Sequence, residues 1–199
     1  MTLDLLLIAA VSLALMHFGL PLAYYLYLKT RWLNKPWSIK RDPSYKPRVT
    51  IIVPTYNEAG FIESKLNDLA RQDYPRELVE VVVIDSASTD RTPEKVEEWV
   101  WRNPGLKLVL IREPARRGKA FALNNALRYT NGEVVVVTDA DSKWASRDTL
   151  SNAVVWLGDP SVGAVTCLKL PASKGVVGVE ESYRAVSYTH LTLPTNREV

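Results

Sequence analysis

The sequence predicts an α/β protein with a parallel sheet and flanking helices, preceded by one transmembrane helix. Short β-branched segments alternate with amphipathic segments at a spacing of roughly 20 to 30 residues, which is typical of right-handed β-α-β crossovers. Ahead of them, residues 5–28 contain no Asp, Glu, Lys or Arg. The composition, 47% hydrophobic and 24% charged, fits a folded domain and not a disordered chain.

The uncharged run 5–28 is long enough to cross a bilayer, because a helix of this length spans roughly 36 Å. Three tyrosines lie near its C-terminal end, where an aromatic belt is expected. A cleaved signal peptide is the alternative. It fits poorly, because Asp4 stands where such peptides carry a basic residue and the apolar run is too long. We therefore expect residues 1–28 to form a transmembrane anchor.

Residues 29–48 form a basic juxtamembrane linker with seven basic residues and one acid. Their net charge of +6 exceeds the +3 of the whole chain, so this segment sets the pI of about 8.9. Positive segments stay on the cytoplasmic side, which predicts a single-pass anchor in the cell membrane with the α/β domain in the cytoplasm. A nucleic-acid binder would spread its basic residues over the folded domain, so no nucleic-acid partner is expected.

Four strands are expected in the α/β domain, at 49–53, 79–84, 106–111 and from Val134 onward. Pro54 lacks a backbone donor and is expected to end the first strand. Helices are expected between the strands. The first, ending near residue 71, has apolar residues at helical spacing, and the second begins at Pro93, which suits a first turn. The third is expected over about 120–129.

The run Val134 to Asp141 is the most informative stretch. Four valines in a row indicate a strand buried on both faces, as in the interior of a parallel sheet. If the strand continues through Ala140, the carboxylates of Asp139 and Asp141 point to the same side. Two carboxylates this close repel each other unless a cation lies between them, and oxygen ligands suit Mn²⁺ or Mg²⁺. The alternative is that one aspartate caps a helix and the other is solvated.

Polar residues follow three of the strands at what should be one edge of the sheet. Tyr56 could stack on a base, Asp85 could accept from a base N–H, and Glu58 could accept from a ribose hydroxyl. Gly118 and Lys119 could approach phosphate. The alternative roles are loop caps, turns and solvated charges. A nucleotide fits such an edge, to which Thr55, Ser86, Asp139 and Asp141 also belong.

Four segments together resemble the family 2 glycosyltransferases of the GT-A fold: VTIIVPTYNEAGFIESKLNDL, VVVIDSASTDRT, REPARRGKAFALNNAL and VVVVTDADSKW. The resemblance implies an enzyme that transfers a sugar, with inversion and with a divalent metal, from a nucleotide-diphosphate sugar to an acceptor hydroxyl. We expect the donor to be a UDP-sugar and the acceptor to be a glycan or lipid-linked. Thr55, Tyr56, Glu58 and Asp85 match the family's nucleoside-binding positions, and Asp139 and Asp141 match its D-x-D pair. The positions expected to bind the nucleotide sugar are therefore Pro54, Thr55, Tyr56, Glu58, Asp85, Ser86, Gly118, Lys119 and Asp139, with Asp139 and Asp141 as metal ligands.

The resemblance covers residues 49–186, which we expect to be an incomplete GT-A domain. The family's general base and its Q-x-x-R-W segment are not found, so the catalytic residue stays unknown. Residues 187–199 resemble read-through of a sequencing adapter and are expected to be an artefactual tail.

Two alternative functions stay open. One is a nucleotide-sugar-binding protein without catalysis. The other is a nucleotidyltransferase, which would need a Gly-rich basic loop directly after the first strand, where this chain has PTYNE. A dinucleotide-binding G-x-G-x-x-G and a P-loop are both absent from the sequence.

Overall fold

The computed structural model describes residues 3–33, 38–144 and 146–167. These residues belong to two units, one up to Ser38 and one from Ile39 onward, which are described separately. The interpretation of residues 187–199 lies outside the described residues, and so does the part of the predicted 49–186 domain that follows residue 167.

The first unit is helical throughout its described part. Helix α1 (Leu3–Ala14) and helix α2 (Leu20–Leu28) are joined by a π-helical segment, Leu15–Gly19, and a second π-helical segment, Lys29–Leu33, follows. Pro21 has no N–H to continue the α-helical ladder, which accounts for the local change of hydrogen-bonding pattern before it. One span, Asp4–Trp32, is long and apolar enough to cross a membrane, a test that a signal sequence also passes.

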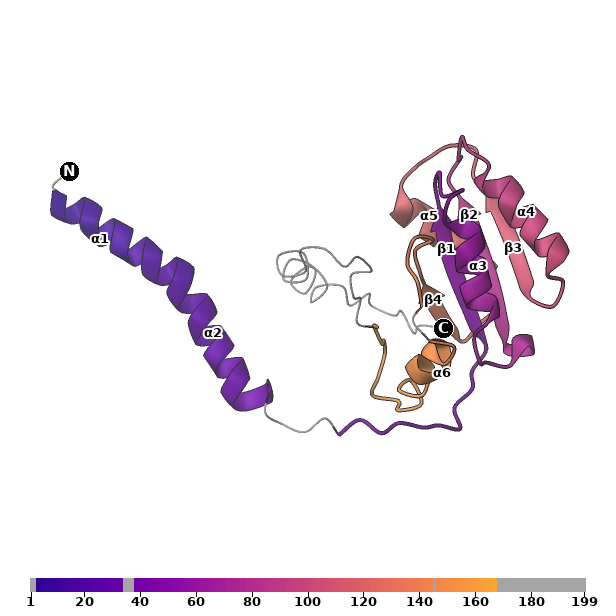
Figure 1. Cartoon of the computed structure of the whole chain (residues 1–199). Coiled ribbons are helices and arrows are strands. Elements are labelled where there is room, and N and C mark those ends of the chain that lie inside the picture. Colours follow the sequence, from indigo (N-terminus) through magenta and orange to yellow (C-terminus); the bar gives the residue numbers. More distant parts are fainter. Residues whose placement is uncertain (1–2, 34–37, 145, 168–199) are drawn as a thin grey trace. The chain divides into compact units, whose positions relative to one another are not determined.

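The second unit contains a four-stranded parallel sheet, as predicted. The strands are β1 (Val49–Thr55), β2 (Val79–Asp85), β3 (Lys107–Arg112) and β4 (Val134–Val137), in the spatial order β3-β2-β1-β4 (Figure 1). The first strand, β1, lies inside the sheet. The next two strands, β2 and β3, are added on one side of β1, and β4 pairs with its other side. The carboxyl ends of all four strands meet at one edge.

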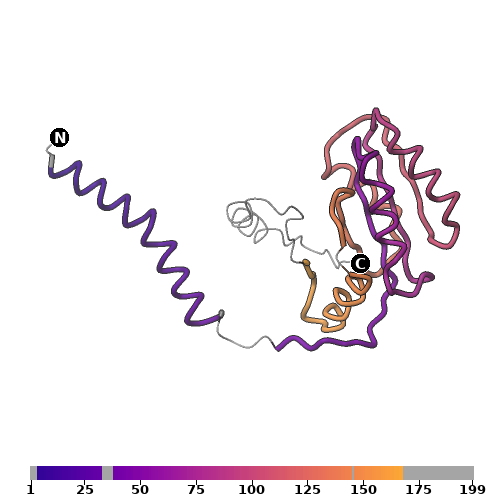
Figure 2. The backbone as a smooth tube through the Cα atoms, in the orientation of Figure 1, coloured from indigo at the N-terminus to yellow at the C-terminus, as the bar shows by residue number. Residues whose placement is uncertain are grey.

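Helices cover both faces of the sheet (Figures 1 and 2). Helices α3 (Ile62–Ala70), α4 (Thr92–Arg102) and α6 (Thr149–Val154) pack on one face and form the larger core with alternate residues of β1 and β2. Helix α5 (Lys119–Ala126) packs on the other face, against Ile52, Val82 and Ile84. Two 3-10 turns, Arg76–Leu78 and Leu127–Tyr129, complete the described elements.

Pro54 does not end strand β1, contrary to the prediction. The strand runs on to Thr55, and Pro54 lies opposite Ile84 of β2. The carbonyl of Ile52 accepts from the N–H of Thr138 on the β4 side, and every second residue turns its backbone groups the same way. The missing N–H of Pro54 therefore faces the β4 side, where pairing has already ended at Ile52, and pairing with β2 continues.

Strand β4 lies at the edge of the sheet formed by the described residues, and not in its interior as predicted. There it pairs with β1, from Val134 to Val137. Val135 and Val137 are 39% and 42% exposed, because α5 packs mainly against β1 and β2. A run of β-branched residues shows that a strand is favoured, but it does not show which of its faces another element covers.

Candidate functional site

The carboxyl edge of the sheet brings together the site residues predicted on separate strands. Thr55 at the end of β1 lies opposite Asp85 at the end of β2. On the other side of β1, the chain leaving β4 is held by the hydrogen bond from Thr138 to Ile52 and then enters Asp139. The parallel arrangement of the strands therefore places Thr55, Asp85 and Asp139 along one edge.

The loops that follow β1 and β2 are locked together by hydrogen bonds from backbone N–H groups to side chains. The N–H of Asn57 donates to Ser88 Oγ (2.9 Å), that of Glu58 to Thr92 Oγ1 (2.8 Å), and that of Ala59 to Asp90 Oδ2 (3.0 Å). These bonds fix the backbone at Glu58, so its carboxylate projects from a well-held loop.

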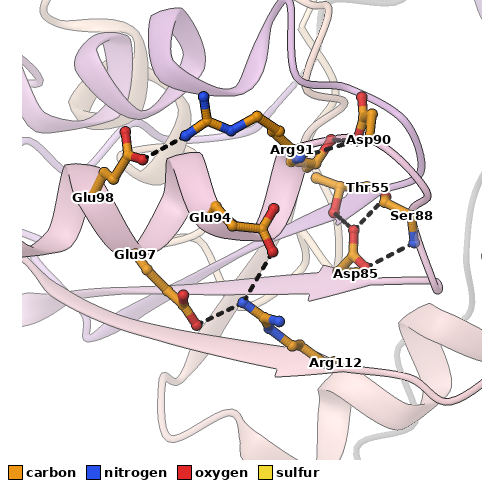
Figure 3. Close-up of polar contacts among 10 residues, drawn as sticks. Thr55, Asp85, Ser88, Asp90, Arg91, Glu94, Glu97, Glu98 and Arg112 are labelled. Carbon is orange, nitrogen blue, oxygen red and sulfur yellow. Dashed lines mark hydrogen bonds and ion pairs between the residues drawn. The ribbon is translucent and has the colours of Figure 1, made fainter.

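Asp85 is buried, with 2% of its surface exposed. Its carboxylate accepts hydrogen bonds from Thr55 Oγ1 (3.3 Å), from the backbone N–H of Ser88 (3.0 Å) and from Ser88 Oγ (2.5 Å) (Figure 3). Asp85 therefore organises its own loop in this structure. Its role as acceptor from a nucleobase stays a prediction.

Ser86 and the end of β3 are tied to structural partners. Ser86 Oγ donates to Glu113 Oε2 (2.9 Å), and the same buried glutamate accepts from Asn125 Nδ2 of α5 (3.1 Å). Arg112 pairs with Glu97 (2.7 Å) and Glu94 (3.8 Å) of α4 (Figure 3). The sequence reasoning missed Glu113, because no local pattern marks a loop glutamate as buried.

The two predicted metal ligands do not lie side by side on a strand. Strand β4 ends at Val137, and Asp139 to Ser142 form a turn, closed by bonds from Ser142 N (3.3 Å) and Ser142 Oγ (2.7 Å) to the carbonyl of Asp139. The expectation that the strand continues through Ala140 is wrong. The carboxylate of Asp139 pairs with Lys119 Nζ (2.5 Å), whereas Asp141 is exposed.

Negative charge is concentrated at this edge. Burial, then the nearby charges of Asp141, Asp139 and Asp90, raise the pKa of Glu58 above its ordinary value. Among the described residues, no group of three His, Cys, Asp or Glu side chains is arranged to hold a metal ion by itself. Proteins nevertheless usually bind Mg²⁺ through only one or two carboxylates when substrate phosphates supply further ligands. The oxygen donors of Asp139 and Asp141 fit such a shared site.

A basic loop folds over the edge from the side of α5. The Arg116 guanidinium lies 3.8 Å from the centroid of the Tyr56 ring, and that of Arg117 lies 3.5 Å from the Phe121 ring. Arg116 therefore occupies a ring face on which a base was predicted to stack. Gly118 has φ of +93°, which favours glycine, and it turns the chain into α5 so that Lys119 reaches Asp139.

Lys65 is a further residue at this edge that the sequence reasoning missed. It belongs to α3 and is 1% exposed. Its Nζ donates to Thr138 Oγ1 and to Ser142 Oγ, both at 3.0 Å, directly beneath the turn that carries Asp139 and Asp141. The sequence did contain a signal: Lys65 stands three residues after Ile62 and four before Leu69, on the apolar stripe of the helix.

The family model for glycosyl transferase family 2 matches residues 50–191. The chain belongs to this family. A solved structure that resembles it is the mannosyltransferase PcManGT from Pyrobaculum calidifontis, in complex with GDP-Man and Mn²⁺. The likeness has a TM-score of 0.74 at 60% identity and covers 80% of this chain and 46% of that one. The GT-A fold predicted from the sequence is confirmed.

Curated relatives of this family 2 chain include two bacterial glycosyltransferases. A beta-monoglucosyldiacylglycerol synthase of Synechocystis is 35% identical over 130 residues, which is 65% of this chain and 27% of that protein. The poly(ribitol-phosphate) beta-N-acetylglucosaminyltransferase TarS of Staphylococcus aureus is 34% identical over 150 residues, 75% of this chain and 25% of TarS. The chain thus spans about a quarter of the length of these relatives.

Proposed function

We propose that this chain is the donor-binding part of a metal-dependent glycosyltransferase that uses a nucleotide-diphosphate sugar. The observation that carries the proposal is the acidic cluster of Glu58, Asp139 and Asp141 at the carboxyl edge, with the cationic side chain of Lys119 beside it. In open α/β sheets this edge is where ligands bind. A diphosphate could pair with Lys119, and a shared cation would relieve the repulsion among the carboxylates.

The donor that we propose is GDP-mannose. The supporting observation is the 60% identity to a mannosyltransferase whose structure holds GDP-Man and Mn²⁺. The motif resemblance alone pointed to a UDP-sugar. Guanine and uracil both carry a ring N–H that could donate to Asp85, so this residue does not distinguish them. Measured affinities for GDP and for UDP therefore distinguish between the two donors.

In the proposed reaction, the residues of this edge hold the donor and stabilise its leaving group. A divalent ion bound by Asp139 and Asp141 would act as a Lewis acid toward the diphosphate. Lys119 would exchange its ion pair with Asp139 for one with phosphate. Inversion requires a general base for the acceptor hydroxyl, and we assign that role to none of the described residues. The acceptor that we propose is a glycan or a lipid-linked acceptor.

We also propose that the helix Asp4–Trp32 anchors the protein in the cell membrane with the catalytic domain in the cytoplasm. The excess of positive charge in residues 29–48 supports this orientation. A cytoplasm-only reporter fused after Arg48 should be active and should sediment with membranes. A reporter found in the soluble fraction, or translocated, would contradict the anchor.

Calorimetric titration of GDP and UDP, with Mn²⁺ and with EDTA, tests the central proposal. We expect GDP to bind with Mn²⁺, UDP to bind more weakly, and both to bind poorly in EDTA. Equal binding in Mn²⁺ and EDTA would overturn the metal site. Tighter binding of UDP would return the donor to the UDP-sugar first predicted. Metal-dependent binding without sugar transfer by the full-length gene product would favour a binding protein without catalysis.

A further inference from the structure

We propose that Lys65 is a positioning residue for the metal site: through Thr138 and Ser142 it holds the turn that carries Asp139 and Asp141. This inference rests on the proposed function, because it assigns a residue to the same site. Lys65 belongs to α3, more than 70 positions before the turn in the sequence, and its hydrogen bonds reach the turn from beneath.

The burial of Lys65 is the first argument. A lysine side chain almost never lies fully inside a protein unless its ammonium group is hydrogen-bonded or paired with an acid, because removing the charge from water is costly. Here the lysine residue is 1% exposed, its ammonium group donates to two hydroxyls, and its Nζ lies 5.5 Å from the centroid of the Trp144 ring. A leucine at this point of the apolar stripe would serve packing alone.

The direction of the hydrogen bonds is the second argument. Lys65 and the Trp144 indole can only donate, and both donate to Thr138 Oγ1, at 3.0 and 3.1 Å. With two bonds accepted, Thr138 must give its own proton to Ser142 Oγ, 3.0 Å away. Ser142 Oγ then accepts from Lys65 and Thr138, and donates its proton to the carbonyl of Asp139 at 2.7 Å. The network runs one way, from Lys65 to the backbone of Asp139.

The consequence is that Lys65 acts on the metal site without touching a metal or a nucleotide. Its two bonds set the orientation of both hydroxyls, and the last bond closes the turn between Asp139 and Ser142. Replacing Lys65 with methionine keeps most of the side-chain volume and removes the ammonium group that donates to Thr138 and Ser142. The hydroxyl protons are then free to turn, and the Asp139–Ser142 turn loses its support.

The test compares Lys65→Met with wild type in the full 199-residue chain. GDP binding is titrated in Mn²⁺ and in EDTA, and free Mn²⁺ is followed by electron paramagnetic resonance. Loss of a residue that orients metal ligands typically weakens metal affinity about 10- to 100-fold, and we expect a loss of that size for GDP in Mn²⁺ and for Mn²⁺ itself. The weak binding in EDTA should not change.

The matched control is Lys107→Met, which removes a lysine that pairs with Glu80 (2.8 Å) at the opposite end of the sheet. It should leave GDP affinity unchanged even if it lowers the melting temperature.

Unchanged Mn²⁺-dependent affinity in a folded Lys65→Met variant would overturn the inference. If that variant does not fold, Ser142→Ala decides: it should weaken binding in the same direction, and wild-type affinity would overturn the inference. Wild-type protein that binds GDP equally in Mn²⁺ and EDTA would instead overturn the proposed function.

Discussion

The two ends of the parallel sheet both carry buried or half-buried carboxylates. At one end hydrogen-bond donors surround the carboxylate, whereas at the other end further acids lie near it. At the amino end, Glu80 is 7% exposed and is bonded by Lys107 (2.8 Å), Thr50 Oγ1 (2.6 Å) and the N–H of Asn131 (2.7 Å). Burial alone would raise the pKa of Glu80, but these hydrogen bonds lower it to about 2. At the carboxyl end, the pKa of Glu58 is raised by burial and by neighbouring acids.

This difference is what we expect between a structural network and the binding site that we propose. The amino end contains the donors that its carboxylate needs, so it is complete without any ligand. The carboxyl end gathers the carboxylates of Glu58, Asp139 and Asp141 beside Lys119, with the Arg116 guanidinium over the Tyr56 ring, and an added cation together with a phosphate ligand would complete its charge balance.

Asp141→Ala should abolish most of the Mn²⁺-dependent nucleotide binding. Without a cation between them, a diphosphate and Asp139 about 4 Å apart repel by roughly 4 kcal/mol at an effective dielectric near 20. Solvent screening reduces this, and we expect at least about a hundredfold loss of affinity by calorimetry. Glu98→Ala, which removes an exposed acid of α4 paired with Arg91, is the control. Equal affinities in both variants would show that Asp141 is not a metal ligand.

Glu80→Gln should destabilise the fold and leave nucleotide affinity unchanged. The substitution weakens a charge-assisted hydrogen bond, which contributes about 1.5–3 kcal/mol. Because the folded pKa of Glu80 is lowered, its stabilisation is present above the ordinary carboxyl range and is lost as pH falls toward about 2. Urea unfolding should therefore depend less on pH over this acidic range in the variant. Identical pH dependence in wild type and variant would be the contrary result.

Glu58→Gln should change the pH dependence of stability in the opposite direction to Glu80→Gln, and by a smaller amount. Because the folded pKa of Glu58 is raised, its ionised form costs stability, and this cost appears as pH rises through the folded pKa. The variant should therefore gain stability relative to wild type in that direction, by less than about 1 kcal/mol for a half-buried group. Urea unfolding with and without Mn²⁺ measures it, and Mn²⁺ should reduce the difference. A variant less stable than wild type at neutral pH would contradict the acidic cluster.

Much of this arrangement could be predicted from the sequence, because parallel strands bring their carboxyl ends to one edge. That rule alone placed Thr55, Asp85 and Asp139 together. The errors arose where several elements meet. The path of the chain after Val137 depends on a turn that is closed by Ser142.

Two further contacts needed the folded structure. Lys65 lies beneath the turn because α3 packs against the strands that precede it, and Arg116 covers Tyr56 because Gly118 turns the basic loop back over the edge. Such contacts join residues far apart in the sequence. The apolar stripe of α3 could indicate that Lys65 is buried, but local patterns of hydrophobicity do not identify the partners that a side chain meets.

Crystals of the protein grown with GDP and Mn²⁺, and measured at the manganese absorption edge, test the central claim most directly. We expect an anomalous peak about 2 Å from a carboxylate oxygen of Asp141, at the edge formed by Thr55, Asp85 and Asp139. We expect no peak at Glu80, whose donors are already in place. GDP bound at this edge without manganese, or a manganese peak away from both Asp139 and Asp141, would contradict that claim.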